Sequence, residues 1–213
     1  MIYINKSGEP ARFAQYRNSR NSKFDDMDQN VKKELRESLL QEQKYLCAYC
    51  MSRIKDDGNV KIEHFRARND DNELEYTNLL AVCKGNEGQP YRKTTCDTRK
   101  GNKSMTINPL SQACMGTIEY RNDGTIFSTD ETYDNDINEI LNLNCEEGYL
   151  KRNRKDALYS LKSLIRKELR PGESAETLLR RLKRGYENQN NVELKEYVGI
   201  LLFHIDKKLR KYE

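Results

Sequence analysis

The cysteines of this chain constrain its fold more than any other feature of the sequence. The 213 residues include six of them, at Cys47, Cys50, Cys83, Cys96, Cys114 and Cys145. Two residues separate Cys47 from Cys50, a spacing that lets both thiolates reach one tetrahedral metal ion with little backbone strain. Twelve residues separate Cys83 from Cys96, so the second pair is less compact. We expect these four cysteines to hold one structural zinc ion; four unconnected buried thiols are the alternative.

A structural metal would also help to stabilise a chain with little apolar material. Charged residues make up 34% of the sequence and hydrophobic residues 36%, so the core is expected to be modest for one domain with an elaboration. Structural zinc contributes on the order of 10 kcal/mol to folding, which would offset this deficit. Cys114 and Cys145 have no partner at metal spacing, and we expect them to be small buried hydrophobic residues.

The sequence predicts a soluble, cytoplasmic protein with no membrane partner. No apolar run reaches the roughly 18–20 residues that span a bilayer, and the first residues lack the apolar stretch of a signal peptide. In a reducing cytosol, paired cysteines are more often metal ligands or catalytic groups than disulfides. The compartment therefore favours the zinc interpretation.

Periodicity in the first half of the chain predicts mixed helices and strands, hence the α+β class. Apolar residues recur at helical spacing over 28–45 and alternate with polar ones over 60–66, and 76–82 is similarly strand-like. A short helix is expected to begin at Cys96, with an acidic residue in its first turn. The polar residues 1–27 are expected to form an extended N-terminal arm, either frayed or used in binding.

The second half is expected to be mostly helical. An Asp-Gly turn predicts a hairpin over 117–128, a short helix is expected over 136–143, and three helices follow at 152–169, 173–187 and 191–211. The last of these is unusually apolar and is a candidate for docking a partner. His204, which lies within it, is expected to be packed rather than catalytic.

These elements divide the chain into four predicted parts. They are the arm at 1–27, a core with the zinc site at 28–110, a hairpin and short helix at 111–150, and a helical region at 151–213. Charge is unevenly distributed: residues 151–185 carry a surplus of +8, whereas 120–150 carry −7. A basic helical region could neutralise nucleic-acid phosphates, or it could be an ordinary solvated face.

The region bracketed by the cysteines carries side chains suited to phosphodiester hydrolysis. That reaction needs a base for water, a divalent metal to offset phosphate charge, and a group that orients the base. His64, one of only two histidines, has a usual pKa near neutrality and can be the base. Asp97 offers the oxygen ligand that Mg²⁺ prefers, and Glu63 and Asn78 lie in the same bracket. Taken singly, each of these residues could also be structural.

Four segments resemble the motif of the HNH endonuclease family: Leu46–Cys50, Ile62–Arg66, Tyr76–Leu80 and Cys96–Gly101. More closely, the chain is similar to the PtuB-type HNH nuclease subunit of Septu anti-phage defence systems and to its retron-associated relatives. The likeness covers roughly residues 1–105. It implies a zinc-stapled ββα-metal finger with an N-terminal helix and a mostly helical C-terminal region.

The resemblance also implies a role for each candidate residue. His64 would be the general base, and Asn78 would hold the active-site loop and orient that histidine. Glu63 and Asp97 would hold a catalytic Mg²⁺ or Mn²⁺ ion, and Lys100 would contact the scissile phosphate.

The implied function is hydrolysis of nucleic acid, with DNA favoured over RNA. The resemblance further implies anti-phage defence together with an ABC/SMC-like ATPase of the PtuA type. The main alternative from the residues is a non-catalytic zinc-finger module that binds nucleic acid or a protein.

Overall fold

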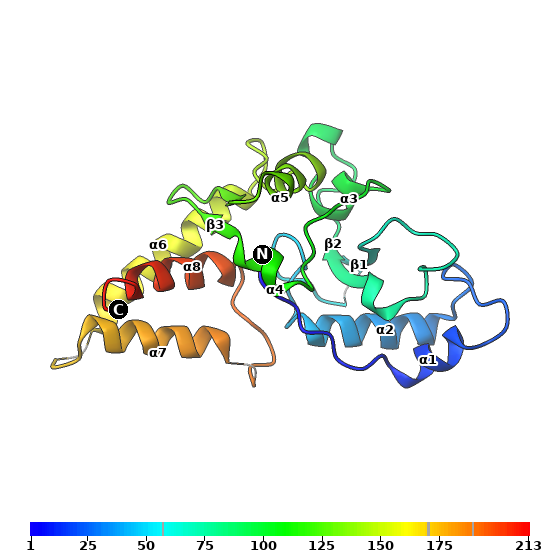
Figure 1. Ribbon diagram of the computed structural model, residues 1–213, viewed down its shortest axis with the longest axis horizontal. Coiled ribbons are helices and arrows are strands. Elements are labelled where there is room, and N and C mark those ends of the chain that lie inside the picture. Colours follow the sequence, from blue (N-terminus) through cyan, green and yellow to red (C-terminus); the bar gives the residue numbers. More distant parts are fainter. Residues whose placement is uncertain (57, 170, 189) are drawn as a thin grey trace.

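The structure is a computed structural model that describes residues 1–56, 58–169, 171–188 and 190–213. The molecule is elongated, with a small sheet and the N-terminal helices in one half and the three C-terminal helices in the other (Figure 1). Short sheets combined with helices agree with the predicted α+β class. None of the helices in the described residues is long and apolar enough to cross a membrane.

Helix α2, Gln29–Glu42, begins where the sequence predicts. The Asp28 side chain accepts a hydrogen bond from the Asn30 amide at 2.7 Å and caps the helix. The buried residues Leu35, Leu39 and Leu40 form one face of the helix. This face packs toward the small sheet, which lies directly above α2 in Figure 1.

Two antiparallel strands and a short helix follow. Strand β1, Val60–His64, pairs with β2, Leu79–Cys83, and the ladder runs without interruption from the Val60–Cys83 pair to the His64–Leu79 pair. The predicted second strand begins later than expected, because residues Tyr76–Asn78 form a single 3-10 turn, η1. Helix α3, Cys96–Lys100, starts at the predicted residue.

The first 27 residues do not form an extended arm, so that prediction is wrong. Residues Ala11–Arg17 form helix α1, which lies beside α2 (Figure 1). Met1, Ile4 and Phe13 are all buried in the core. The sequence concealed this packing because single apolar residues stand among polar ones without a clear period.

A hairpin and two short helices connect the halves. Helix α4, Gln112–Gly116, precedes the predicted hairpin, whose strands are β3, Ile118–Tyr120, and β4, Ile126–Ser128. Helix α5, Glu131–Asn135, then continues into a π-helical turn, η3, at Asp136–Ile140.

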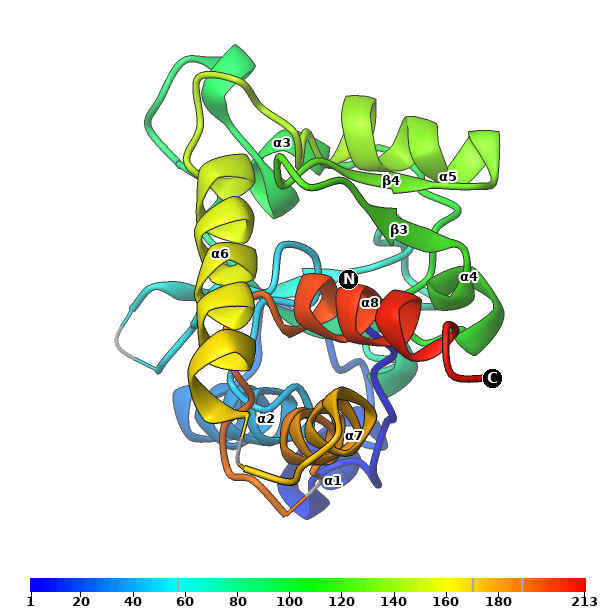
Figure 2. The ribbon, with the colours of Figure 1, turned by 90° about the vertical axis from the view of Figure 1, so that its left-hand side faces the viewer.

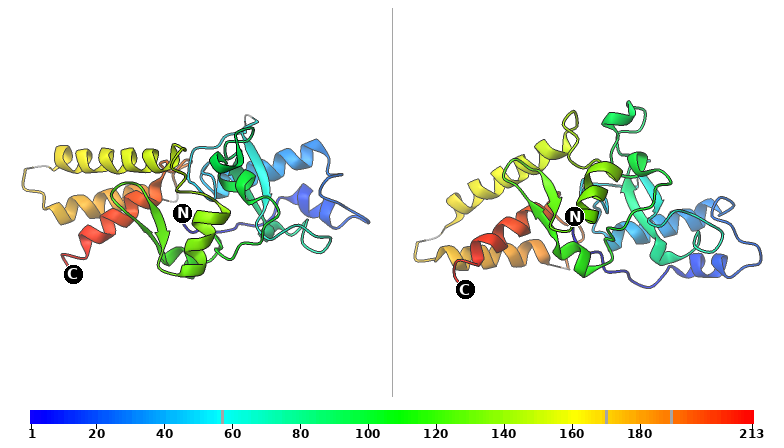
Figure 3. Two further views of the ribbon diagram at one scale, coloured as in Figure 1. Left: turned by 90° about the horizontal axis from the view of Figure 1, so that it is seen from above. Right: turned by 45° about the horizontal axis from the view of Figure 1, so that its top comes forward.

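Helices α6, Leu150–Glu168, α7, Ala175–Glu187, and α8, Val198–Leu209, form the far half. Figure 2 shows α6 at the margin of the molecule beside α8, and Figure 3 shows the same arrangement from above. Buried Arg154 joins α6 to the hairpin turn, where it donates to the Gly124 carbonyl at 2.6 Å.

The last helix is shorter than the sequence predicts. Residues 191–197 are not helical, since the Leu194 amide donates to the Lys44 carbonyl and the Tyr197 amide donates to the Met51 carbonyl. Most apolar residues of α8 are buried within the chain's own core. Their burial removes the reason for assigning this face to a partner.

The two cysteines outside the cluster and the four predicted parts of the chain can also be located in the structure. Cys114 and Cys145 are buried, as expected. One hydrophobic cluster contains Met1, Leu39, Ile126 and Leu158, one from each of the four predicted parts. The four-part division itself stays a prediction.

His204 gives the fold a predictable response to acid. Its Nε2 atom is buried and has no hydrogen-bond partner in the described part of the chain. Burial, and then the charges of Lys162, Lys207 and Lys208, lower the pKa of His204 to about 4. The unfolded chain therefore binds more protons between about pH 6.5 and pH 4, so this group makes stability fall as the pH falls through that window.

We expect His204→Leu to unfold at a higher temperature than the wild type at pH 4.5, with a smaller difference at pH 7.5. Thermal unfolding of both chains across this range measures the effect. Acidic groups common to both chains cancel in the comparison. A difference that does not change with pH would contradict the prediction.

Candidate metal centre and active site

The four predicted zinc ligands come together in the structure. Their sulfur atoms all lie within 4.8 Å of one another. The Cys50–Cys83 sulfur distance is 3.7 Å and the Cys47–Cys96 distance is 4.0 Å. A tetrahedral ion with metal–sulfur bonds of about 2.3 Å requires sulfur–sulfur distances of about 3.8 Å, whereas a disulfide requires about 2.05 Å. The cluster could therefore hold a metal such as zinc.

Local backbone geometry explains how distant cysteines meet. The segment 47–51 folds into a tight knuckle in which the Met51 amide donates to the Cys47 carbonyl, and Met51 has a φ of 62°. The Cys83 amide donates to the Cys47 sulfur at 3.4 Å, which ties the end of β2 to the knuckle. Cys96 completes the cluster from the first residue of α3.

A separate pocket of about 400 Å³ lies at the end of β1, between α3 and the loop 65–73. It is lined by Phe24, Ile62, Glu63, His64, Ala67, Arg68, Asp97, Lys100, Gly101 and Asn102. The structure therefore brings His64, Glu63, Asp97 and Lys100 to one pocket. Asn78 does not line it and acts on it through the loop.

His64 is held in one orientation by its surroundings. Its Nε2 atom lies 3.0 Å from the Glu73 carbonyl oxygen, and its ring meets Phe24 edge-on with centroids 4.6 Å apart. A carbonyl oxygen only accepts, so Nε2 must carry the hydrogen, which leaves the Nδ1 lone pair of the neutral ring available. Burial lowers the pKa of His64, so burial favours this neutral form.

Asn78 fixes the loop that holds the histidine. Its side-chain oxygen accepts from the Arg66 amide at 2.7 Å, and its amide group donates to the carbonyls of Arg66 and Asn72, both at 3.3 Å. Asn72 directly precedes Glu73, whose carbonyl binds His64. Asn78 therefore acts on the histidine indirectly, through the backbone of this loop.

Glu63 is a buried carboxylate with two donors on one oxygen. Its Oε1 atom accepts from the Tyr49 hydroxyl at 3.2 Å and lies 2.7 Å from the Lys100 ammonium nitrogen. Burial and, next, the hydrogen-bonded Asp97 carboxyl group raise the pKa of Glu63 to about 8, against the opposing effect of Lys100. Two carboxyl groups crowded in one pocket favour a bound cation.

Asp97 and Lys100 extend from α3, one turn apart. Asp97 forms an ion pair with Lys61 at 3.2 Å, and its side chain is partly open to the pocket. The side chain of Lys100 is only 1% exposed, and its ammonium group also donates to the His64 carbonyl at 3.0 Å. Lys100 is thus an internal partner of Glu63 in this structure, and its predicted phosphate contact stays a prediction.

Sequence reasoning missed two contributors to this site. Tyr49 lies between the knuckle cysteines, and only its place inside the Cys-x-x-Cys motif marked it. Phe24 comes from the segment predicted to be an arm and packs on His64. Neither contact could be deduced without the positions of these segments in the fold.

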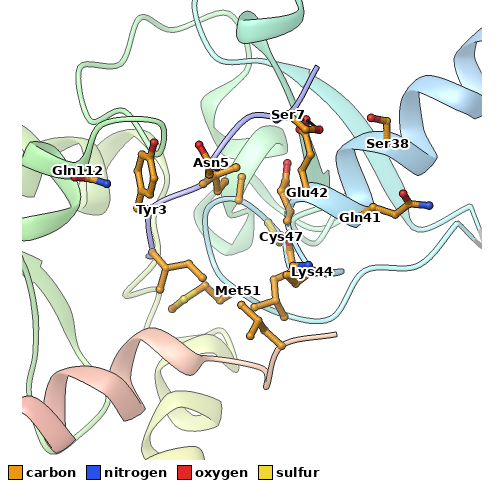
Figure 4. A pocket seen from close by; sticks show the side chains of 16 residues that line it. Tyr3, Asn5, Ser7, Ser38, Gln41, Glu42, Lys44, Cys47, Met51 and Gln112 are labelled. Carbon is orange, nitrogen blue, oxygen red and sulfur yellow. Dashed lines mark hydrogen bonds between the residues drawn. The ribbon is translucent and has the colours of Figure 1, made fainter. Parts of the chain in front are cut away.

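A second pocket, of about 720 Å³, lies on another side of the cysteine knuckle. Figure 4 shows Tyr3, Asn5 and Ser7 from the N-terminal segment, with Ser7 beside Glu42 at the end of α2, to which its hydroxyl donates at 2.6 Å. None of the described residues that line it belongs to the predicted catalytic set. We therefore place the candidate chemistry in the smaller pocket.

Comparison with known proteins finds a relative that matches part of the chain. No protein-family model matches the chain. Over 81 aligned positions the chain is 33% identical to an Escherichia coli protein described as "Retron Ec83 putative HNH endonuclease". The match covers 32% of this chain and 31% of that relative, so the chain spans about a third of the relative's length. The chain is thus similar, over this part of its length, to a protein described as a putative HNH endonuclease.

Proposed function

We propose that this protein is an HNH endonuclease that hydrolyses phosphodiester bonds of nucleic acid. The observation that carries the proposal is the His64 geometry: a backbone carbonyl binds Nε2 and leaves the Nδ1 lone pair available, and the carboxyl groups of Glu63 and Asp97 line the same pocket. The succession of β1, β2 and α3 supports assignment of this region to a ββα-metal finger. DNA is the first substrate to test, and RNA the second.

Each of the five predicted residues has a separate task in this mechanism. His64 accepts a proton from water at Nδ1, while the Glu73 carbonyl keeps the ring in place. Glu63 and Asp97 present oxygen atoms to a divalent cation, Mg²⁺ or Mn²⁺. When bound, that cation stabilises negative charge on the phosphate and on the departing oxygen. Asn78 holds the loop, and Lys100 orients Glu63 and is the proposed phosphate contact.

The experiment that tests the proposal measures nicking of supercoiled plasmid by the wild type and by Asp97→Ala. We expect cutting only with Mg²⁺ or Mn²⁺, and a loss of about a hundredfold or more in the variant, since it lacks one cation ligand. Zinc content is measured beside activity. Absence of cutting by a wild-type protein that holds zinc would instead support the non-catalytic zinc-finger module, and equal cutting by both proteins would remove Asp97 from the mechanism.

The resemblance to the Septu nuclease subunit extends the proposal to an anti-phage role with an ABC/SMC-like ATPase. Because α8 uses its apolar residues internally, that partner would contact a different surface. Co-expression with an ATPase encoded beside the nuclease, followed by co-purification, tests the association. Separate elution of two folded proteins would remove this extension.

A further inference from the structure

The outward side of α6 carries cations that no carboxylate neutralises. Arg152, Lys155, Arg166 and Lys167 are all exposed. In the described part of the chain none of the four forms an ion pair, although 22 such contacts occur elsewhere. Part of the positive surplus noted in the sequence over 151–185 therefore lies on this side of α6.

Helix α7 provides an internal comparison, because its cations are mostly paired. The pairs are Arg180–Glu176 at 2.8 Å, Arg181–Glu173 at 3.2 Å and Lys183–Asp206 at 2.7 Å. Two neighbouring basic helices thus differ: α7 pairs most of its cations within the protein, whereas α6 leaves these four open to solvent. If both helices were merely solvated basic surfaces, there would be no reason for one to pair its cations and the other to leave them unpaired.

The four cations and Tyr159 share one side of the helix. Positions 152, 155, 159 and 166 recur at helical spacing, and Tyr159 between them is 72% exposed. Asp156 is the one carboxylate on this side in the described residues. From Arg152 to Lys167 the row extends about 22 Å at 1.5 Å per residue. Figures 2 and 3 show α6 at the margin of the molecule.

We propose that this side of α6, named here the α6 basic face, binds the phosphate backbone of a nucleic-acid duplex. It consists of Arg152, Lys155, Tyr159, Arg166 and Lys167. The proposal rests on the nuclease function above and adds the form of its substrate, a double strand held outside the catalytic pocket.

Physical reasons favour a duplex over a protein partner. Protein interfaces have apolar centres from which charged residues are depleted, whereas the α6 basic face has no exposed aliphatic side chain at its centre. Its length is about two-thirds of one duplex turn of roughly 34 Å, which brings several phosphates within reach of the row. Lys, Arg and Tyr side chains are common donors to phosphate oxygens.

The test compares two fourfold variants in the full chain, each made with His64→Ala so that bound nucleic acid is not cut. One carries R152Q, K155Q, R166Q and K167Q. The matched control carries K207Q, K208Q, R210Q and K211Q, which removes four exposed cations at the end of α8. Fluorescence anisotropy measures Kd over a range of salt concentrations. The probes are a 30-base-pair DNA duplex and an RNA duplex of the same length and sequence.

We expect the α6 variant to bind duplex about tenfold or more weakly than the control, with a salt slope smaller by about 2 to 4. Loss on only one of the two duplexes would identify the sugar type that the face accepts. Equal losses in the two variants would overturn the proposal, since net charge alone would then explain binding. Unchanged duplex binding would overturn it in favour of an acidic protein partner.

The two proposals fail separately in this design. Binding is measured with a chain that cannot use His64, so absence of nuclease activity in the plasmid assay does not affect the result. Conversely, the wild type could cut plasmid while the α6 variant binds duplex as well as the control. That result would support the proposed function and contradict the role of the α6 basic face.

Discussion

Replacement of His64 with alanine is expected to slow plasmid cleavage by about 10²–10⁴-fold, the usual contribution of a general base. The reason is geometric: the Nδ1 lone pair is available because the Glu73 carbonyl binds Nε2. The side chain is only half-buried, so the unfolding temperature should change much less than the rate. Cleavage rates at saturating Mg²⁺ and thermal unfolding of the same samples measure both effects.

His204→Ala is the matched control, since it removes the other histidine of the chain. We expect this variant to cut as fast as the wild type. Partial recovery of His64→Ala by added imidazole would support the loss of a base rather than a displaced loop. Cleavage by His64→Ala at the wild-type rate would remove His64 from the mechanism.

Replacement of Cys50 with serine is expected to cause the largest loss of stability. Structural zinc contributes on the order of 10 kcal/mol, a value comparable to the entire stability of an ordinary domain. The knuckle, the end of β2 and the start of α3 each contribute ligands to the cluster, so loss of the metal would release all three segments. We therefore expect the variant to lack zinc and to unfold at or below room temperature.

Cys145→Ala serves as the control because Cys145 is also buried and lies outside the cluster. It should retain about one zinc per chain and lose about 1 kcal/mol, as expected for a small cavity. Zinc content by elemental analysis and unfolding by circular dichroism measure both variants. A folded Cys50→Ser protein of normal stability would show that the four thiols are not a structural metal site.

The parts of the fold that follow local rules could be predicted from the sequence. The start of α2 at its Asp28 cap, the hairpin around Gly124 and the first residue of α3 all follow from neighbours in the chain. The cysteine cluster was also predictable, because metal ligands must converge whatever the path between them. Convergence of His64 and Asp97 on one pocket was predicted only as a consequence of that framework.

The remaining features depend on long-range packing. Lys100 was expected to contact the scissile phosphate, yet its side chain is buried, where it pairs with Glu63 and donates to the His64 carbonyl. Met1 and Phe13 are buried although the segment around them is polar. No local pattern distinguishes such residues from exposed ones.

The adjacency of Cys96 and Asp97 in the first turn of α3 has a consequence for the maturation of the protein. One residue belongs to the cysteine cluster, and the next belongs to the proposed catalytic pocket. Without zinc, the start of α3 would lose its anchor and Asp97 its position. Insertion of zinc would therefore complete the proposed catalytic pocket as well as the fold of a newly synthesised chain.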